Sequence, residues 1–156
     1  FESAMYTFVF LWSPILENAQ VSGSTLPYGL ILASFMVSFM IGSLIFKALN
    51  GRRQWLPEAI VQLAFGVAAN RFSSSTPPPH HQDQTFLLMA FNIFEACCGL
   101  YFPSMGTIRG RFVPEETRST VMNVFRIPLN LIVVAALLKV DSMSSALLFS
   151  ICTSLV

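Results

Sequence analysis

The chain has 156 residues, of which 54% are hydrophobic and only 11% are charged, and its formal net charge is +1. An average soluble domain has about 25% charged residues, so this composition excludes a globule that covers itself with polar surface in water. The small net charge, without a basic stripe interleaved with aromatic residues, excludes nucleic acid as a partner.

Six apolar segments predict an all-α, polytopic membrane helical bundle. A helix of about 20 residues crosses the ~30 Å hydrocarbon core of a lipid bilayer. The predicted spans cover residues 1–16, 27–49, 57–70, 84–108, 114–140 and 143–156. The chain opens at Phe1 inside one apolar run and closes at Val156 inside another, so we expect both outer spans to be cut and the chain to be part of a longer polypeptide.

The first two spans each have a face of polar or small residues. One side of the first span aligns Glu2, Tyr6, Ser13 and Glu17. The second span repeats small residues every four positions, at Ser34, Ser38 and Gly42. Such a repeat favours close approach of a neighbouring helix, and it is as compatible with plain packing as with a face that lines a pathway.

The fourth span is almost wholly apolar, but one carboxylate, Glu95, lies at its centre. A lone acid at mid-depth costs on the order of 3 kcal/mol or more, and proteins keep that cost mainly where a solute or proton must pass. Glu95 therefore indicates a membrane transport protein. The same helix face continues with Asn92, Gly99, Pro103 and Gly106, which favour close helix packing. Cys97 and Cys98 fit neither a disulfide framework nor a metal motif and are interpreted as packing residues.

The fifth span places three polar residues on one stripe: Asn123, Arg126 and Asn130. Arg126 is the only cation assigned to the interior of a span, so it needs a partner or a wet cavity. Pro128 removes a backbone hydrogen bond and is expected to kink the helix. Two interpretations stay open, because Glu95 and Arg126 could line a pathway or could form an ion pair that only joins two helices.

Basic residues in the connections predict the orientation of the bundle. They gather after the second and fourth spans, at Lys47, Arg52, Arg53, Arg109, Arg111 and Arg118. The opposite side has only Arg71 and Lys139, so the first group should face the cytoplasm. The proline-rich stretch from Ser73 to Gln84 would then be external. Its His80–His81 pair has no further ligand at metal spacing, so we expect solvated histidines and no metal.

Particular strings add a resemblance to this pattern. The triplet Gly42-Ser43-Leu44, followed by Asn50-Gly51-Arg52-Arg53, resembles a degenerate form of the loop motif of major facilitator superfamily carriers. Two longer strings resemble the molybdate-anion transporter branch of that superfamily: FESAMYTFVFLWSP at residues 1–14 and FEACCGLYFPSMGTIRGRFVPEETRSTVMNVFRIPLNLIVV at residues 94–134. The resemblance implies that residues 1–156 form the C-terminal half-bundle, with the last helix incomplete.

The resemblance and the polar faces together give the expected function. We expect secondary active uptake of a small oxyanion, molybdate, by alternating access, in the plasma membrane and without a cofactor. The expected partners are molybdate, the lipid bilayer and the missing N-terminal half of the same polypeptide. The candidate residues of the substrate pathway are Arg126, Asn123, Asn130, Asn92, Glu95, Glu2 and Tyr6.

Alternatives to this function and to the roles of the carboxylates stay open. Glu2 and Glu95 would repel a dianion, so they could carry coupling protons or hold Arg126 in place. A carrier of another small solute and a receptor or scaffold on a carrier fold are the alternative functions. No enzyme is expected, because the sequence has no HExxH motif, no GxSxG motif and no aspartate within a span.

Overall fold

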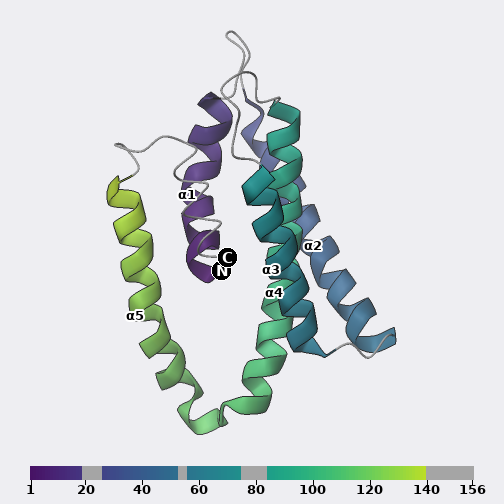
Figure 1. Ribbon diagram of the computed structural model, residues 1–156, viewed down its shortest axis with the longest axis vertical. Coiled ribbons are helices and arrows are strands. Elements are labelled where there is room, and N and C mark those ends of the chain that lie inside the picture. Colours follow the sequence, from purple (N-terminus) through teal and green to yellow (C-terminus); the bar gives the residue numbers. More distant parts are fainter. Residues whose placement is uncertain (19–25, 53–55, 75–83, 140–156) are drawn as a thin grey trace.

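A computed structural model describes residues 1–18, 26–52, 56–74 and 84–139. These residues form five helices and no strand (Figure 1): α1 Glu2–Asn18, α2 Tyr28–Arg52, α3 Pro57–Ser74, α4 Gln84–Phe112 and α5 Glu115–Lys139. The all-α class is thus confirmed for the described part of the chain. The sixth predicted span, residues 143–156, lies outside it, as do Arg53 and the connection that contains His80 and His81.

Local signals explain where the helices begin and end. Pro57 is the first residue of α3, a position where its missing N–H costs nothing. The break between α4 and α5 falls at Val113 and Pro114, because a proline disfavours helical geometry in the residue before it. α5 opens with Glu115 and Glu116, whose charges suit the positive end of the helix dipole. α4 therefore runs four residues past the predicted end at Ile108.

The five helices alternate in direction, and α4 is the central one (Figure 1). α2 and α3 pack against α4, whereas α5 stands apart and contacts α1. α1 lies between α4 and α5 and contacts both. The end of α2, the start of α3 and the turn from α4 to α5 all lie at one end of the bundle. The alternation assumed for the predicted orientation is therefore confirmed for α1 to α5.

Aromatic side chains form the part of the core that joins α1 to α2 and α4. We call Phe8, Trp12, Phe35, Phe91 and Phe94 the aromatic cluster. The ring of Phe8 lies 5.0 Å from the rings of both Phe91 and Phe94, and Trp12 meets Phe35 edge-on at 5.4 Å. Tilted and edge-on pairs of this kind add to the free energy gained by burying the rings.

α2 and α4 approach each other closely at two glycines. A methyl group added to Gly42 would collide with the carbonyl oxygen of Ala96, and one added to Gly99 would collide with that of Phe39. The hydroxyl of Ser43 also donates a hydrogen bond of 3.1 Å to the carbonyl oxygen of Gly99. The predicted close approach at these small residues is confirmed, whereas Gly106 has open space around it.

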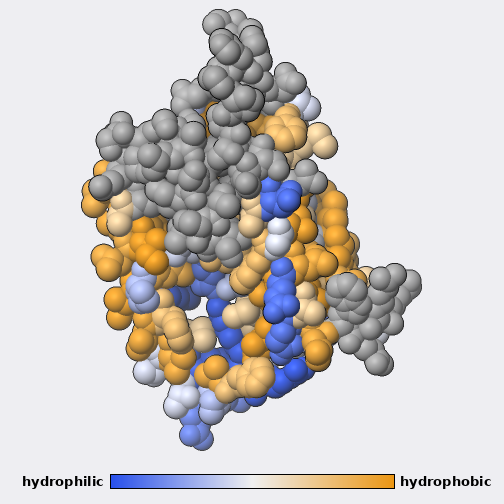
Figure 2. Space-filling view, in the orientation of Figure 1, coloured by the Kyte–Doolittle hydropathy of each residue, from blue (hydrophilic) through white to orange (hydrophobic). Residues whose placement is uncertain are grey.

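Two of the described helices are long and apolar enough to cross a membrane: α2 over Tyr28–Gly51 and α4 over Thr85–Phe112. α4 is mainly buried among its neighbours, whereas α2 exposes most of its apolar surface. Figure 2 shows apolar residues along both flanks of the molecule and hydrophilic residues gathered in the lower middle. By length and composition, α1, α3 and α5 do not reach the same threshold, so six membrane spans are not established.

Candidate functional site

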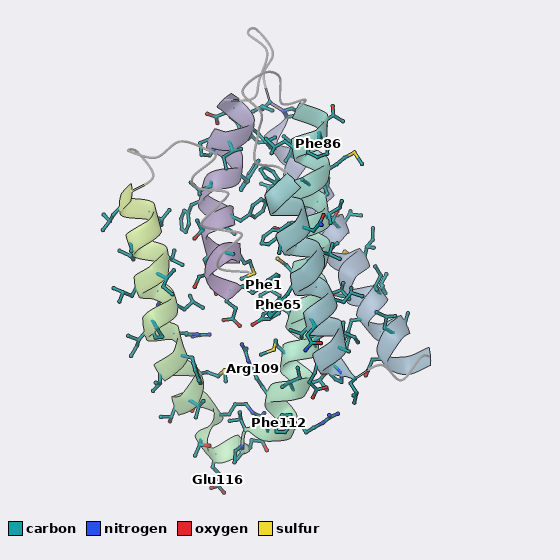
Figure 3. All side chains as sticks on the ribbon, viewed as in Figure 1. Phe1, Phe65, Phe86, Arg109, Phe112 and Glu116 are labelled. Atoms are coloured by element: carbon teal, nitrogen blue, oxygen red, sulfur yellow. The ribbon has the colours of Figure 1, made fainter. Side chains whose placement is uncertain are left out.

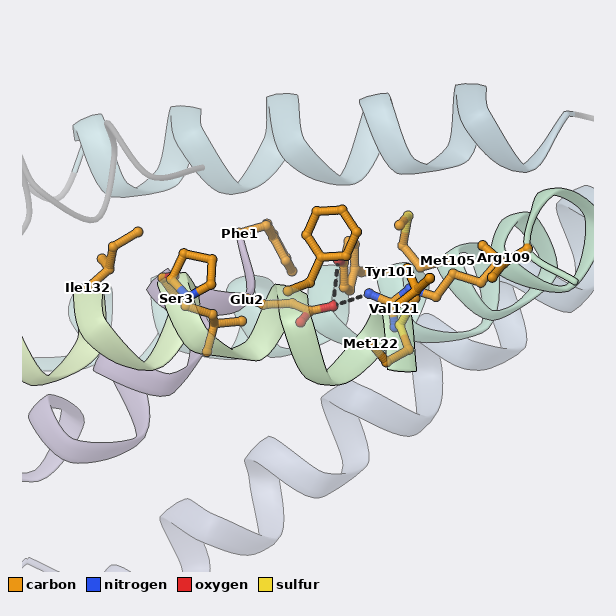
Figure 4. Close-up of a pocket in the computed structure, with 13 residues that line it drawn as sticks. Phe1, Glu2, Ser3, Tyr101, Met105, Arg109, Val121, Met122 and Ile132 are labelled. Atoms are coloured by element: carbon orange, nitrogen blue, oxygen red, sulfur yellow. Dashed lines mark hydrogen bonds and ion pairs between the residues drawn. The ribbon is translucent and has the colours of Figure 1, made fainter. Parts of the chain in front are cut away.

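Two adjoining cavities lie between α1, α4 and α5. They share five lining residues: Glu2, Arg109, Met122, Phe125 and Leu129. The first, the apolar compartment, has a volume of about 480 Å³ and is completed mainly by hydrophobic side chains (Figure 4). The second, the polar compartment, has a volume of about 450 Å³ and is completed by Tyr6, Phe102, Arg126 and Asn130. The polar compartment is the candidate functional site.

Four of the predicted pathway residues meet in the polar compartment. Glu2 and Tyr6 lie one turn apart on α1, and Arg126 and Asn130 lie one turn apart on α5. Both pairs come from helices that contact each other. A spacing of four residues keeps each pair on one face of its helix, which is why two helices are enough to assemble the group.

The centre of the site is an interaction that the sequence did not predict. Arg109 of α4 forms an ion pair with Glu2 of α1, and the hydroxyl of Tyr101 donates a hydrogen bond of 2.8 Å to the same carboxylate oxygen. Figure 4 shows the three side chains meeting beside the apolar compartment. The side chains of Arg109 and Glu2 are 31% and 25% exposed, so the pair is partly hydrated. It joins residues that are far apart in the sequence.

Arg109 was expected in the connection after the fourth span, and the structure places it in the last turn of α4, while its cytoplasmic location stays a prediction. Figure 3 shows its side chain directed from α4 toward the space between α4 and α5. The signal that could have placed it was Pro114, a stronger helix stop than the polar residues after Ile108. Arg126 is therefore not the only cation within a helix of the described chain.

The side chain of Arg126 is exposed and makes no hydrogen bond or ion pair with any residue that the structure describes. The position of Arg126 within a membrane span stays a prediction, because its exposure is that of this chain by itself. The sequence left open an ion pair between Glu95 and Arg126, and the described residues do not form it. Its guanidinium faces the polar compartment, where a bound anion could reach it.

Glu95 and Asn92 lie on α4 away from both compartments. Glu95 is buried, with 9% of its surface exposed, and precedes Phe102 by two turns of the helix. The side chain of Asn92 accepts a hydrogen bond of 2.8 Å from Ser38 of α2 and donates one of 2.8 Å to the carbonyl oxygen of Leu88. Asn92 therefore joins α4 to α2 in this structure.

Asn123 lines neither compartment, although it was placed on one stripe with Arg126 and Asn130. The face of α5 that meets the cavities is centred on Met122, Phe125 and Leu129. Successive helix residues rotate by about 100°, so Asn123 falls just beyond the edge of that face. The stripe was correct as geometry, but a sequence does not show how a helix is turned toward its neighbours.

The described residues contain no group of three or more ligating side chains that could hold a metal ion. Cys97 and Cys98 are both buried in α4, in agreement with their interpretation as packing residues, and they form no disulfide in the described chain.

A helical bundle with a polar, cationic compartment between apolar helices is an arrangement that membrane transport proteins use. The family model described as sugar transporters with 12 transmembrane segments matches residues 1–78, which is half of the chain. The chain belongs to this family of the major facilitator superfamily, and within it to the molybdate-anion transporter branch. It is accordingly part of an integral membrane protein of a transport family.

Several relatives carry the name molybdate-anion transporter, and three of them illustrate the similarity. The one from Takifugu rubripes is 37% identical over 146 residues, covering 88% of this chain and 28% of the relative. The relative from Xenopus tropicalis is 35% identical over 138 residues, covering 85% and 29%. The relative from Danio rerio is 37% identical over 142 residues, covering 88% and 28%. The chain thus spans less than a third of the length of these relatives. No solved structure matches it significantly.

Proposed function

We propose that this chain is part of a secondary carrier that takes up a small oxyanion, with molybdate as the substrate. The observation that carries the proposal is the polar compartment, where Arg109 and Arg126 face a space with a single carboxylate, Glu2. Guanidinium groups match the oxygens of oxyanions and form charge-assisted hydrogen bonds with them. The names of the relatives support the same substrate.

The charge of the compartment favours an anion over a neutral sugar, the substrate class in the description of the family. The three charged side chains leave one net positive charge, which attracts an anion and gives a neutral solute no Coulombic gain. Tyr6 and Asn130 supply further hydrogen-bonding groups. Asn92, Glu95 and Asn123 remain proposed members of the pathway outside this compartment.

The transport mechanism that we propose is alternating access in the plasma membrane. The chain would form the C-terminal half-bundle and rock against the N-terminal half of the same polypeptide around a site between them. Two observations support this proposal: the family has 12 transmembrane segments, and the compartment opens at the exposed Arg126. Transport by this route requires no cofactor and no covalent chemistry.

Uptake of radiolabelled molybdate into vesicles that contain the full-length parent protein tests the proposal. We expect saturable uptake that excess unlabelled molybdate abolishes and excess sugar leaves unchanged. Competition by sugar would instead indicate a sugar carrier. Absence of uptake of any solute by correctly inserted protein would favour a receptor or scaffold on a carrier fold.

A further inference from the structure

Arg109 has donors that the described residues do not use. Its guanidinium donates a hydrogen bond to Glu2 through Nη2 and also interacts with the neighbouring Tyr101 hydroxyl. A guanidinium has five N–H donors, so these two contacts leave donors for another acceptor, and the side chain is 31% exposed. Because Arg109 lines both compartments, an acceptor inside either one can reach it.

The carboxylate of Glu2 occupies the position that an anion would take. Its Oε1 atom accepts from both Arg109 and the Tyr101 hydroxyl, so the donors converge on one negatively charged oxygen. An oxyanion presents the same kind of oxygen to the same donors. Exchange of Glu2 for a bound oxyanion would therefore keep the hydrogen bonds of Arg109 and Tyr101 satisfied.

Arg126 faces the same polar compartment from α5, with no partner among the described residues. We propose that Arg109 is a second anion-binding side chain beside Arg126, and that Glu2 occupies its donors until the oxyanion displaces it. This inference rests on the proposed function and adds to it the second arginine and the internal competitor. Repulsion between Glu2 and the anion then moves the carboxylate away from Arg109.

Arg111, on the same helix, provides a matched control for Arg109. Arg111 lies two residues after Arg109, is exposed, and pairs with Glu58 of α3 at 3.6 Å, outside both compartments. Replacing Arg111 removes the same charge from the same end of α4. Loss of binding that is specific to Arg109 thus reports the compartment and not the general charge of that end.

The experiment measures equilibrium binding of radiolabelled molybdate to the purified full-length parent protein in detergent. Four proteins are compared: wild type, Arg109→Ala, Glu2→Gln and Arg111→Ala. We expect Arg109→Ala to bind at least about tenfold more weakly, because a hydrogen bond to a charged group is lost. Glu2→Gln should bind several-fold more tightly, because the amide keeps the size of the carboxyl but cannot compete as an anion. Arg111→Ala should bind as the wild type does.

Each other outcome overturns the inference. Wild-type affinity of Arg109→Ala would leave the proposed function standing and remove Arg109 from the site. Unchanged or weaker binding by Glu2→Gln would assign the Glu2–Arg109 pair a purely structural role. If Arg109→Ala does not fold, the binding of molybdate by Glu2→Gln alone decides whether Glu2 competes with the anion. A wild-type protein that binds no molybdate would overturn the proposed function itself, and this inference with it.

Discussion

Arg126 is an exposed cation that faces a cavity, and this position sets its expected role. A charge on a helix of a membrane protein is retained at a cost unless it meets water, a partner or a ligand. Among the described residues Arg126 has no partner, and the polar compartment that it lines also contains Tyr6 and Asn130 as hydrogen-bonding groups. A transported anion is the ligand that would complete its interactions.

Replacing Arg126 should therefore impair transport. We expect Arg126→Ala in the full-length parent to abolish molybdate uptake, and Arg126→Lys to reduce it, because lysine keeps the charge but loses the planar fork of donors. Uptake into vesicles at matched surface expression measures both effects, with Arg111→Ala as the control. Normal uptake by Arg126→Ala would remove Arg126 from the pathway.

The two arginine–glutamate combinations should differ in energetic coupling. Double-mutant cycles on the thermal stability of the full-length parent should give about 0.5–1 kcal/mol for Glu2 with Arg109, which form a partly exposed ion pair. The cycle for Glu95 with Arg126 should give a coupling energy within about 0.3 kcal/mol of zero, because these side chains do not pair in the structure. Larger coupling in the second cycle would show that the two side chains meet in the assembled protein.

Regular helix spacing grouped several side chains that the structure brings into one cavity, and their role in a substrate pathway stays a prediction. Glu2, Tyr6, Arg126 and Asn130 were all predicted for the pathway, and all line the polar compartment. Arg109 was missed because the end of α4 was set at Ile108, six residues before the proline that stops the helix. The rotation of α5 about its own axis, which turns Asn123 away from the cavity, depends on packing against α1. The sequence of α5 alone does not reveal this rotation.

At the scale of helices, the contact between α2 and α4 is the tightest constraint in the described chain. Gly42 and Gly99 each meet the backbone of the opposite helix, so no flexible side chain can move aside for a larger residue. Gly106 lies two turns after Gly99 on α4 and has open space around it. These glycines form a natural pair for comparison.

Replacing Gly99 should separate α2 from α4. We expect Gly99→Val to lower the free energy of unfolding of the full-length parent by about 1–3 kcal/mol, the usual range for an overpacked site. Gly106→Val should change it by less than about 0.5 kcal/mol, as expected of a position without close neighbours. Thermal denaturation in detergent compares the two. Equal stability of both variants would mean that α2 and α4 are farther apart in the full protein.

The orientation of α4 in the membrane can be tested by labelling its two ends. Thr85 and Gly110 are exposed and lie about 37 Å apart along the helix at 1.5 Å per residue, more than the hydrocarbon thickness of a bilayer. In a cysteine-free parent, a membrane-impermeant maleimide added to intact cells should label Thr85→Cys and leave Gly110→Cys unlabelled. The reverse pattern would invert the topology predicted from the basic residues.

The existence of the first five helices could be predicted from apolar runs and prolines, but which helices pack against each other could not. Amphipathic spacing shows that a helix has an inward face, and it does not show which helix covers that face. α3, for example, was expected to end at Asn70 and extends to Ser74. Contacts such as Glu2 with Arg109 join distant positions, and local patterns carry no information about them.

At the scale of the whole molecule, this chain exposes surfaces that a larger protein would cover. α2 and α5 present many large apolar side chains to the outside, and the polar compartment opens beside them at Arg126. Lipid can cover the apolar faces, whereas a polar opening needs protein or water. The chain spans 28% of the relative from Takifugu rubripes, so most of that relative has no counterpart here.

The 156-residue chain alone should therefore not transport. We expect no molybdate uptake by vesicles reconstituted with it, while vesicles with the full-length parent take up molybdate. Co-expression of the remaining segment of the parent as a separate polypeptide is the informative control, because restored uptake would show that the chain folds competently. Uptake by the chain alone would refute the half-bundle assignment.

The attachments of α1 to its neighbours are of two kinds, aromatic and ionic. Toward Trp12 the helix is held by the aromatic cluster, whose attraction comes from buried hydrocarbon. At Glu2 a partly hydrated ion pair with α4 adds to the contacts of the Phe1 ring with Phe94 and Tyr101. Mobile ions screen the second kind of attachment and hardly affect the first. The ionic strength of the surrounding solution therefore acts on one attachment of this helix alone: it weakens the ion pair beside the cavity, while the aromatic contacts at both ends keep α1 in place.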